Sequence, residues 1–202
     1  MEMFEILDII GIIAFTISGF LYSIKKDLDL LGVVFISTVT ALAGGVIRDI
    51  IINSKPFIFT HYYPLSVVFI TMIVLSLIIK YNIKYKNIFI LVDAIGLVTF
   101  AITGTMLGIE NDFNIFGIIF LGTLTAVGGG VVRDITLNNV PYIFKADFYA
   151  TIAIIISILY FLIDKYIEVN NDSIVIVLVV IGVIIRFIAV KKNWGLPKFN
   201  NN

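Results

Sequence analysis

The sequence contains two copies of one unit. When residues 8–59 are placed on residues 93–144, a shift of 85 positions without a gap, 23 of the 52 pairs are identical. The strongest block, Gly-Gly-Val-x-Arg-Asp-Ile, occupies residues 44–50 and 129–135. Shared apolar composition would match isoleucine with valine, but it would not match glycine, arginine and aspartate in one register. Any fold of this chain must therefore accommodate an internal duplication.

Each copy consists of long apolar segments. The chain has 202 residues, of which 60% are hydrophobic and 14% are charged, whereas soluble domains are about half apolar and about a quarter charged. Segments near the length that crosses a ~30 Å hydrocarbon layer recur along the chain. Seven can be drawn, at residues 4–24, 30–52, 65–80, 87–108, 114–137, 148–164 and 173–190. The third and sixth are short.

These segments predict an all-α integral membrane protein with seven transmembrane helices. We expect one membrane domain over residues 1–202, with repeat one at 4–80, repeat two at 87–164 and a seventh helix at 173–190. Because each copy has three spans, an odd number, the second copy must enter the bilayer from the opposite face. Such inverted repeats are common in transporters. The charges agree, since Lys25-Lys26 in repeat one corresponds to Glu110-Asn111 in repeat two.

Lysines are distributed unequally between the two sides of this topology. Two lie on the side of the N-terminus, Lys55 and Lys165, and nine lie on the side of the C-terminus. The positive-inside rule then predicts a cytoplasmic C-terminus and an external N-terminus. We expect a multi-pass protein of the plasma or inner membrane.

Glycine pairs lie inside the second and fifth segments. The pattern Thr-x-Thr-Ala-x-x-Gly-Gly-Val-x-Arg-Asp runs from Thr38 to Asp49 and from Thr123 to Asp134. Adjacent glycines weaken a helix, so Gly44-Gly45 and Gly129-Gly130 predict a kink or a short unwound stretch. Backbone freed in this way must face protein or a watery cavity, where its carbonyls can coordinate a cation. The alternative is that small residues let helices pack closely.

Charged residues follow these glycines. An ionised group in the bilayer costs at least ~2.5–3.5 kcal/mol, so Arg48-Asp49 and Arg133-Asp134 should point inward and be paired. Adjacent residues do not face each other on a helix, and we therefore expect partners on another helix, with Asp8 and Asp93 as candidates. Alternatively, the Arg-Asp pairs lie near helix ends and snorkel or cap, and Asp8 and Asp93 act as N-cap or early-turn carboxylates.

Other polar residues allow two interpretations. The hydroxyls of Thr38, Thr40, Thr123 and Thr125 could face a pore or bond back to their own helices. Arg186 is expected to snorkel to the interface, and Tyr149 to join an interfacial aromatic belt.

Several functional classes are not expected. The formal net charge is zero and cysteine is absent, so nothing indicates nucleic-acid binding or thiolate chemistry. No nucleophile motif, phosphate loop or metal-ligand spacing appears, and we expect neither an enzyme nor a bound cofactor or metal.

At these residues the chain resembles a known family. Two three-helix repeats with Gly-Gly-x-x-Arg-Asp in each middle span, followed by a seventh helix, look like the prokaryotic branch of the trimeric intracellular cation (TRIC) channels. The same branch is also called the glycine transporter domain family. The resemblance covers roughly residues 4–190. It implies a homotrimer in membrane lipid with a pore inside each subunit. The second and fifth predicted helices would line this pore and would be kinked at their glycine pairs. The resemblance also implies permeation of monovalent cations, chiefly potassium.

Two functions are therefore in view. In a potassium-type channel, the threonines and backbone would replace part of an ion's hydration shell, and the Arg-Asp pairs with Asp8 and Asp93 would set the field and gate. In a secondary transporter of glycine or another small zwitterion, an arginine and an aspartate would hold the two ends of the solute. Arginines repel cations unless carboxylates neutralise them, which is the difficulty for the channel.

Overall fold

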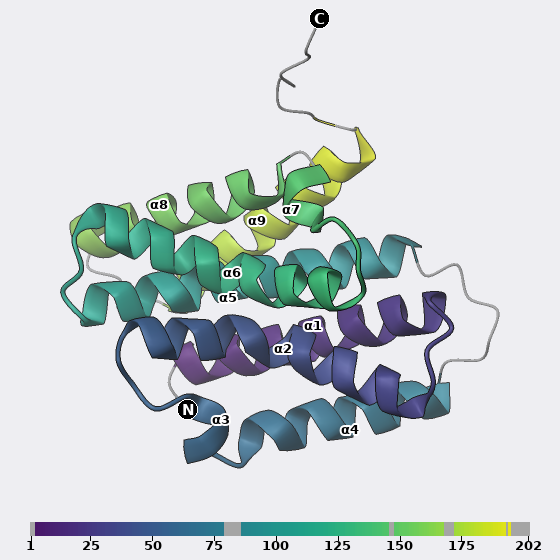
Figure 1. Cartoon of the computed structure of the whole chain (residues 1–202). Coiled ribbons are helices and arrows are strands. Elements are labelled where there is room, and N and C mark those ends of the chain that lie inside the picture. Colours follow the sequence, from purple (N-terminus) through teal and green to yellow (C-terminus); the bar gives the residue numbers. More distant parts are fainter. Residues whose placement is uncertain (1–2, 79–85, 146–147, 168–171, 193, 195–202) are drawn as a thin grey trace, which may run out of the picture.

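The regular structure is helical. A computed structural model describes residues 3–78, 86–145, 148–167, 172–192 and 194 (Figure 1). Over these residues the chain forms α1 (Met3–Lys25), α2 (Leu30–Ile51), α3 (Phe57–Thr60), α4 (Tyr63–Ile78), α5 (Lys86–Glu110), α6 (Ile115–Thr136), α7 (Tyr142–Lys145), α8 (Tyr149–Ile167) and α9 (Asp172–Lys191).

The long helices follow the predicted spans closely. In the described part of the chain, six helices are long and apolar enough to cross a membrane, and α4 is a shorter apolar helix. The sixth span was expected to be short, but α8 has 19 residues. The last two residues of the predicted third span lie outside the described residues. Because helices satisfy their backbone polar groups internally, this all-helical arrangement fits a multi-pass membrane protein.

The duplication is visible in the backbone. The ends of α2 and α6 differ by 85 residues, the shift found in the sequence. Side chains of Asp29 and Asn114 accept hydrogen bonds from the backbone three residues on, at 2.7 and 2.9 Å, and so cap these two helices. The left-handed residues that end the first two helices of each repeat also correspond: Asp27 and Asp112 have φ of 53° and 54°, and Asn53 and Asn138 have φ of 57° and 53°.

Two short helices were not predicted. Residues 53–64 and 138–147 were expected to be loops, yet α3 and α7 each form one turn within them. Pro56 precedes α3 and Pro141 precedes α7, and proline is well tolerated at a helix start because it has no N–H to satisfy. A four-residue helix has no apolar period long enough to be detected in a sequence.

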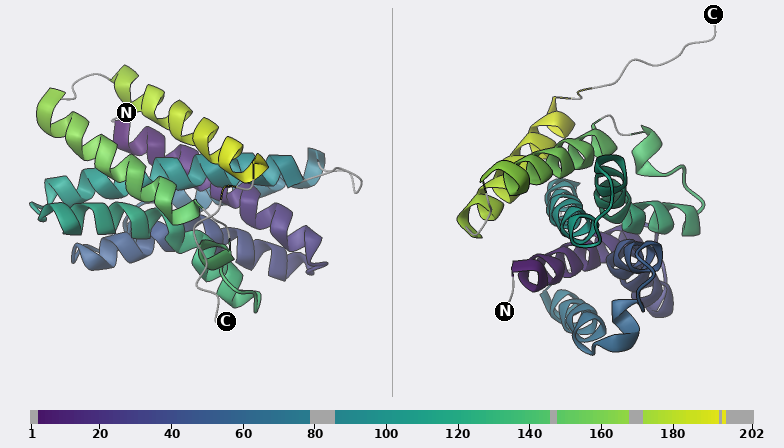
Figure 2. Two further views of the ribbon diagram at one scale, coloured as in Figure 1. Left: turned by 90° about the horizontal axis from the view of Figure 1, so that it is seen from above. Right: turned by 90° about the vertical axis from the view of Figure 1, so that its left-hand side faces the viewer.

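The helices form layers. Helices α1, α2, α5 and α6 pack together at the centre, α4 packs on α1 and α2, and α8 and α9 cover α5 on the opposite side (Figures 1 and 2). The rings of Phe15 and Phe100 meet edge to face with centroids 5.3 Å apart. These two residues are equivalent in the repeats, so their contact lies close to the axis that relates the two halves.

Candidate functional site

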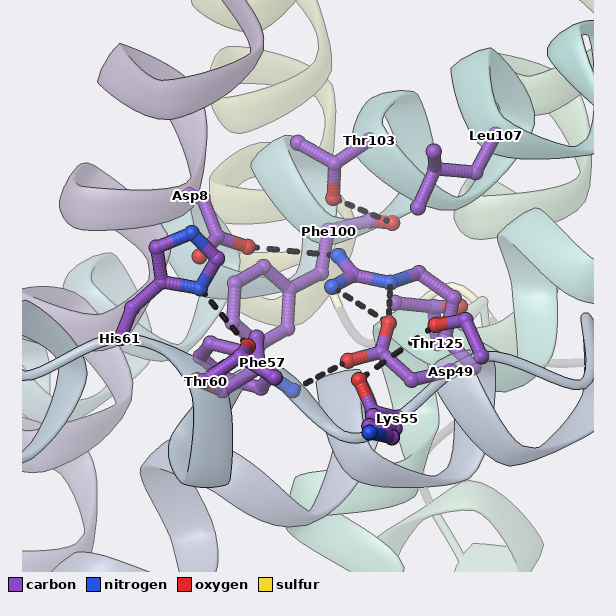
Figure 3. Close-up of polar contacts among 12 residues, drawn as sticks. Asp8, Asp49, Lys55, Phe57, Thr60, His61, Phe100, Thr103, Leu107 and Thr125 are labelled. Atoms are coloured by element: carbon purple, nitrogen blue, oxygen red, sulfur yellow. Dashed lines mark hydrogen bonds and ion pairs between the residues drawn. The ribbon is translucent and has the colours of Figure 1, made fainter.

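The first charged cluster joins α1, α2 and α4. We define it as Asp8, Arg48, Asp49 and Tyr63. Nη1 of Arg48 lies 3.3 Å from Oδ1 of Asp8, and its Nε and Nη2 lie 2.9 Å from Oδ1 of Asp49. The Tyr63 hydroxyl donates to Oδ2 of Asp8 at 3.1 Å. The backbone N–H of Phe57, at the start of α3, donates to Oδ2 of Asp49 at 2.8 Å (Figure 3).

This cluster is shielded from solvent. Arg48 is 2% exposed and Asp8 is fully buried. The Arg48 guanidinium also lies over the rings of Phe4 and Phe57, 5.3 and 5.6 Å from their centroids. Cation–π contacts of this kind gain strength when they are desolvated. The arginine is thus held by two carboxylates and two aromatic faces.

The second charged cluster is the equivalent arrangement in repeat two. We define it as Asp93, Arg133, Asp134 and Ser18. Nη1 of Arg133 lies 3.2 Å from Oδ1 of Asp93, and its Nε lies 2.9 Å from Oδ1 of Asp134. The backbone N–H of Tyr142, at the start of α7, donates to Oδ2 of Asp134 at 2.7 Å. The short helix α7 therefore braces this carboxylate as α3 braces the first.

The two clusters differ in their third partner. In the second cluster, Arg133 donates to the Ser18 hydroxyl at 2.9 Å, and Ser18 donates to Oδ1 of Asp93 at 3.1 Å. The repeat equivalent of Ser18 is Thr103, whose hydroxyl instead contacts the backbone oxygen of Phe100 at 3.4 Å (Figure 3). Ser18 belongs to α1, so repeat one contributes a side chain to the cluster of repeat two.

The predicted ion pairs are present, and two other expectations about these residues are wrong. The pairing of Arg48 with Asp8 and of Arg133 with Asp93 is confirmed. Asp8 and Asp93 lie inside α1 and α5, so the N-cap alternative is wrong for both. The expectation that adjacent Arg and Asp do not contact is also wrong. The arginine side chain is long enough to fold back onto its neighbour, whose carboxylate is fixed by the short helix that follows.

The glycine pairs serve close packing. Both α2 and α6 remain α-helical through their glycines, so the expected unwound stretch is absent from these two helices. A Cβ on Gly44 would overlap the carbonyl oxygen of Thr125, and one on Gly129 would overlap that of Thr40. The two contacts are equivalent under the repeat. Glycine therefore lets α2 and α6 cross backbone to backbone, as the packing alternative holds; a bend without unwinding stays a prediction.

The four threonines bond back to their own helices. Each hydroxyl donates to the carbonyl four residues earlier, at 2.8 Å for Thr38 and Thr123, 2.6 Å for Thr40 and 2.7 Å for Thr125. Thr40 and Thr125 are fully buried, whereas Thr38 and Thr123 are half-buried. The structure thus brings the glycines and the inner threonines to the helix crossing, and the charged residues to the two clusters.

Two residues near the second cluster were misjudged from sequence. Arg186 of α9 is 2% exposed, not snorkelling, and its guanidinium lies 4.8 Å from the centroid of the Tyr149 ring. Tyr149 is 2% exposed rather than interfacial. Its hydroxyl is buried without a hydrogen-bond partner among the described residues. Both residues belong to helices whose inner faces could not be identified from strings of apolar residues alone.

Tyr63 and Ser18 are the members of the clusters that sequence reasoning missed. Tyr63 was placed in a polar loop, and Ser18 lies among apolar residues of the first span. The position equivalent to Ser18 in repeat two is Thr103. Comparison of the two repeats therefore could not identify Ser18 as a conserved member of a charged cluster.

The family model that matches this chain covers the same two repeats as the sequence analysis. The family model described as Glycine transporter matches residues 5–80 and 90–165. UPF0126 membrane protein YvgT of Bacillus subtilis is 33% identical over 96% of this chain and 95% of its own. A solved TRIC cation channel is 36% identical with a TM-score of 0.84, covering 98% of both chains. A prokaryotic TRIC channel crystallised in 0.5 M KCl is 34% identical with a TM-score of 0.83, covering 96% of this chain and 98% of its own.

Proposed function

The chain belongs to the TRIC family, whose sequence model carries the description Glycine transporter, and on that premise we propose that it is a channel for monovalent cations, chiefly potassium. The pathway runs through each subunit, between the two repeats, past the first and second charged clusters. Two solved structures similar to this chain are TRIC channels, and one of them is described as a cation channel, which favours this function over a carrier for glycine.

The observation that carries the proposal is the charge of the clusters. Each contains two carboxylates and one guanidinium, namely Asp8 and Asp49 with Arg48, and Asp93 and Asp134 with Arg133. With these groups ionised, a carboxylate is in excess in each cluster. Pairing also removes the difficulty that a buried arginine repels cations, because each guanidinium is engaged by carboxylates. A region with negative excess charge and low dielectric attracts cations and repels anions.

We infer the surroundings of the channel from the same premise. The lysine bias favours an external N-terminus and a cytoplasmic C-terminus for a protein of the plasma or inner membrane. The assembly is a homotrimer in lipid, and each subunit carries its own pathway. The glycines position the pathway helices α2 and α6, and the carboxylates of the two clusters determine its charge.

The test is transport by the purified protein in liposomes. Potassium efflux down its gradient and uptake of labelled glycine are measured on the same preparation, with protein-free liposomes as the blank. We expect rapid potassium flux that added glycine does not alter. We do not expect a chloride flux in its place. Saturable glycine uptake that accelerates when glycine is present on the other side would support the carrier instead. Absence of potassium flux would contradict the proposal.

A further inference from the structure

The two buried aspartates that face the arginines are not equivalent. In the first charged cluster both carboxylate oxygens of Asp8 are used, since Oδ1 lies 3.3 Å from Nη1 of Arg48 and Oδ2 accepts from the Tyr63 hydroxyl at 3.1 Å. In the second, Arg133 and Ser18 both use Oδ1 of Asp93. Among the described residues, Oδ2 of Asp93 has no hydrogen-bond donor.

This difference comes from the helices that follow each cluster. Tyr63 is the first residue of α4, and the 85-residue shift places Phe148, which has no hydroxyl, at the corresponding position. Tyr149, the first residue of α8, has a hydroxyl, but it bonds to no described residue. Repeat two therefore has no counterpart of the Tyr63–Asp8 hydrogen bond in the part of the chain described.

We propose that Tyr63 is a positioning residue whose hydrogen bond weakens cation binding at Asp8. Of the two aspartates, Asp93 then offers the oxygen that binds a cation more strongly. This inference rests on the proposed channel function. A carboxylate oxygen that already accepts a hydrogen bond must exchange that bond for contact with the ion, whereas Oδ2 of Asp93 need not. The Tyr63 hydroxyl thus occupies the second oxygen of Asp8, whereas the second oxygen of Asp93 accepts no hydrogen bond from the described residues.

The position of Tyr63 suits this role. Its ring is half-buried and is held beside His61, with centroids 5.7 Å apart. The helix that it begins packs at the edge of the bundle, on α1 and α2, with Val68 and Met72 buried. Replacement by phenylalanine therefore removes the hydroxyl and leaves the ring and the helix contacts in place.

The test compares two tyrosine variants in potassium-loaded liposomes. Tyr63→Phe frees one oxygen of Asp8, so the potassium concentration that gives half-maximal flux should fall by about tenfold, the effect of one hydrogen bond to a charged group. Tyr62→Phe is the matched control, because Tyr62 is next to Tyr63 in the chain but is 95% exposed, and its half-maximal concentration should equal that of the wild type. Equal half-maximal concentrations for Tyr63→Phe and wild type would overturn the inference.

A double variant separates positioning from a merely structural role. If Tyr63 acts through Asp8, then adding Tyr63→Phe to Asp8→Asn leaves the half-maximal concentration unchanged. An equal shift in both backgrounds means that the tyrosine acts elsewhere, and the inference fails. If Asp8→Asn does not fold, the comparison of Tyr63→Phe with Tyr62→Phe decides alone. A wild type that conducts no cation contradicts the proposed function itself, whereas a conducting wild type with an unresponsive Tyr63→Phe contradicts only this inference.

Discussion

Arg48 and Arg133 are among the largest fully buried side chains of the described chain, which is unusual for a charged residue. Taking a charge out of water costs several kcal/mol per ion, and this cost is offset only by good geometry and further hydrogen bonds. Both arginines meet that condition, with two carboxylates each and aromatic rings nearby. Removing the arginine alone would leave two buried carboxylates uncompensated.

We therefore predict that Arg133→Gln destabilises the protein strongly. Breaking a buried ion pair on one side typically costs ~3–5 kcal/mol, and the loss should appear as a lower free energy of unfolding in mixed micelles. Lys192→Gln is the control, because Lys192 is exposed and surface substitutions change stability by only about 0.5 kcal/mol. Equal stability of the two variants would show that the second charged cluster contributes nothing to the fold.

Tyr149 leads to the opposite expectation. Its hydroxyl is buried without a partner among the described residues, and an unsatisfied buried polar group costs ~1–3 kcal/mol. Tyr149→Phe should therefore leave the thermal unfolding midpoint unchanged or raise it. The ring contact with Arg186 is retained, because phenylalanine presents the same face. A lower midpoint would mean that the hydroxyl has a partner, such as a bound water.

At the level of elements, the crossing of α2 and α6 holds the two repeats together. Gly44 and Gly129 each face the carbonyl oxygen of a threonine on the other helix. A Cβ added at Gly128 would lie 3.1 Å from Cα of Gly44. Backbone cannot yield as a flexible side chain can. The helices can approach so closely only because these positions have no side chain.

Gly44→Ala and Gly129→Ala should accordingly each lower stability by ~1–3 kcal/mol, the usual cost of overpacking. In an uncrowded helix the same change would be favourable, since alanine is the better helix former. Gly117→Ala is the control, because a Cβ added at Gly117 would lie 3.3 Å from its nearest atom, Cβ of Phe113, which belongs to the same repeat. Thermal unfolding of the three variants in detergent compares them directly. Loss of stability confined to Gly117→Ala would contradict the packing role of the glycine pairs.

The sequence was informative about elements and less so about contacts. Apolar length and the 85-residue register predicted the long helices to within a few residues, because both are local properties of the chain. The ion pair of Arg48 with Asp8 could be predicted because a buried charge needs a partner and few candidates exist. Tyr63 and Ser18 could not, because a neutral hydroxyl among apolar residues has no such requirement, and its partner lies on a distant helix.

At the scale of the whole molecule, the duplication requires that equivalent loops lie on opposite sides of the membrane. Lys55 and Val140 are equivalent in the repeats and both are exposed. The chain has no cysteine of its own, so Lys55→Cys and Val140→Cys can be labelled singly in intact cells with a membrane-impermeant thiol reagent. We expect Lys55→Cys to react from outside and Val140→Cys to react only after the membrane is opened.

This labelling also tests the orientation inferred from lysines. Reaction of Val140→Cys alone from outside would keep the inverted repeat and reverse the orientation. Reaction of both cysteines from the same side would contradict the inversion.

If every subunit of a trimer contains its own pathway, single-channel recording in planar bilayers will detect the three pathways of one assembly. We expect three equally spaced conductance levels, each with a reversal potential that follows the potassium gradient. A single indivisible level, or a reversal potential that follows chloride, would contradict it.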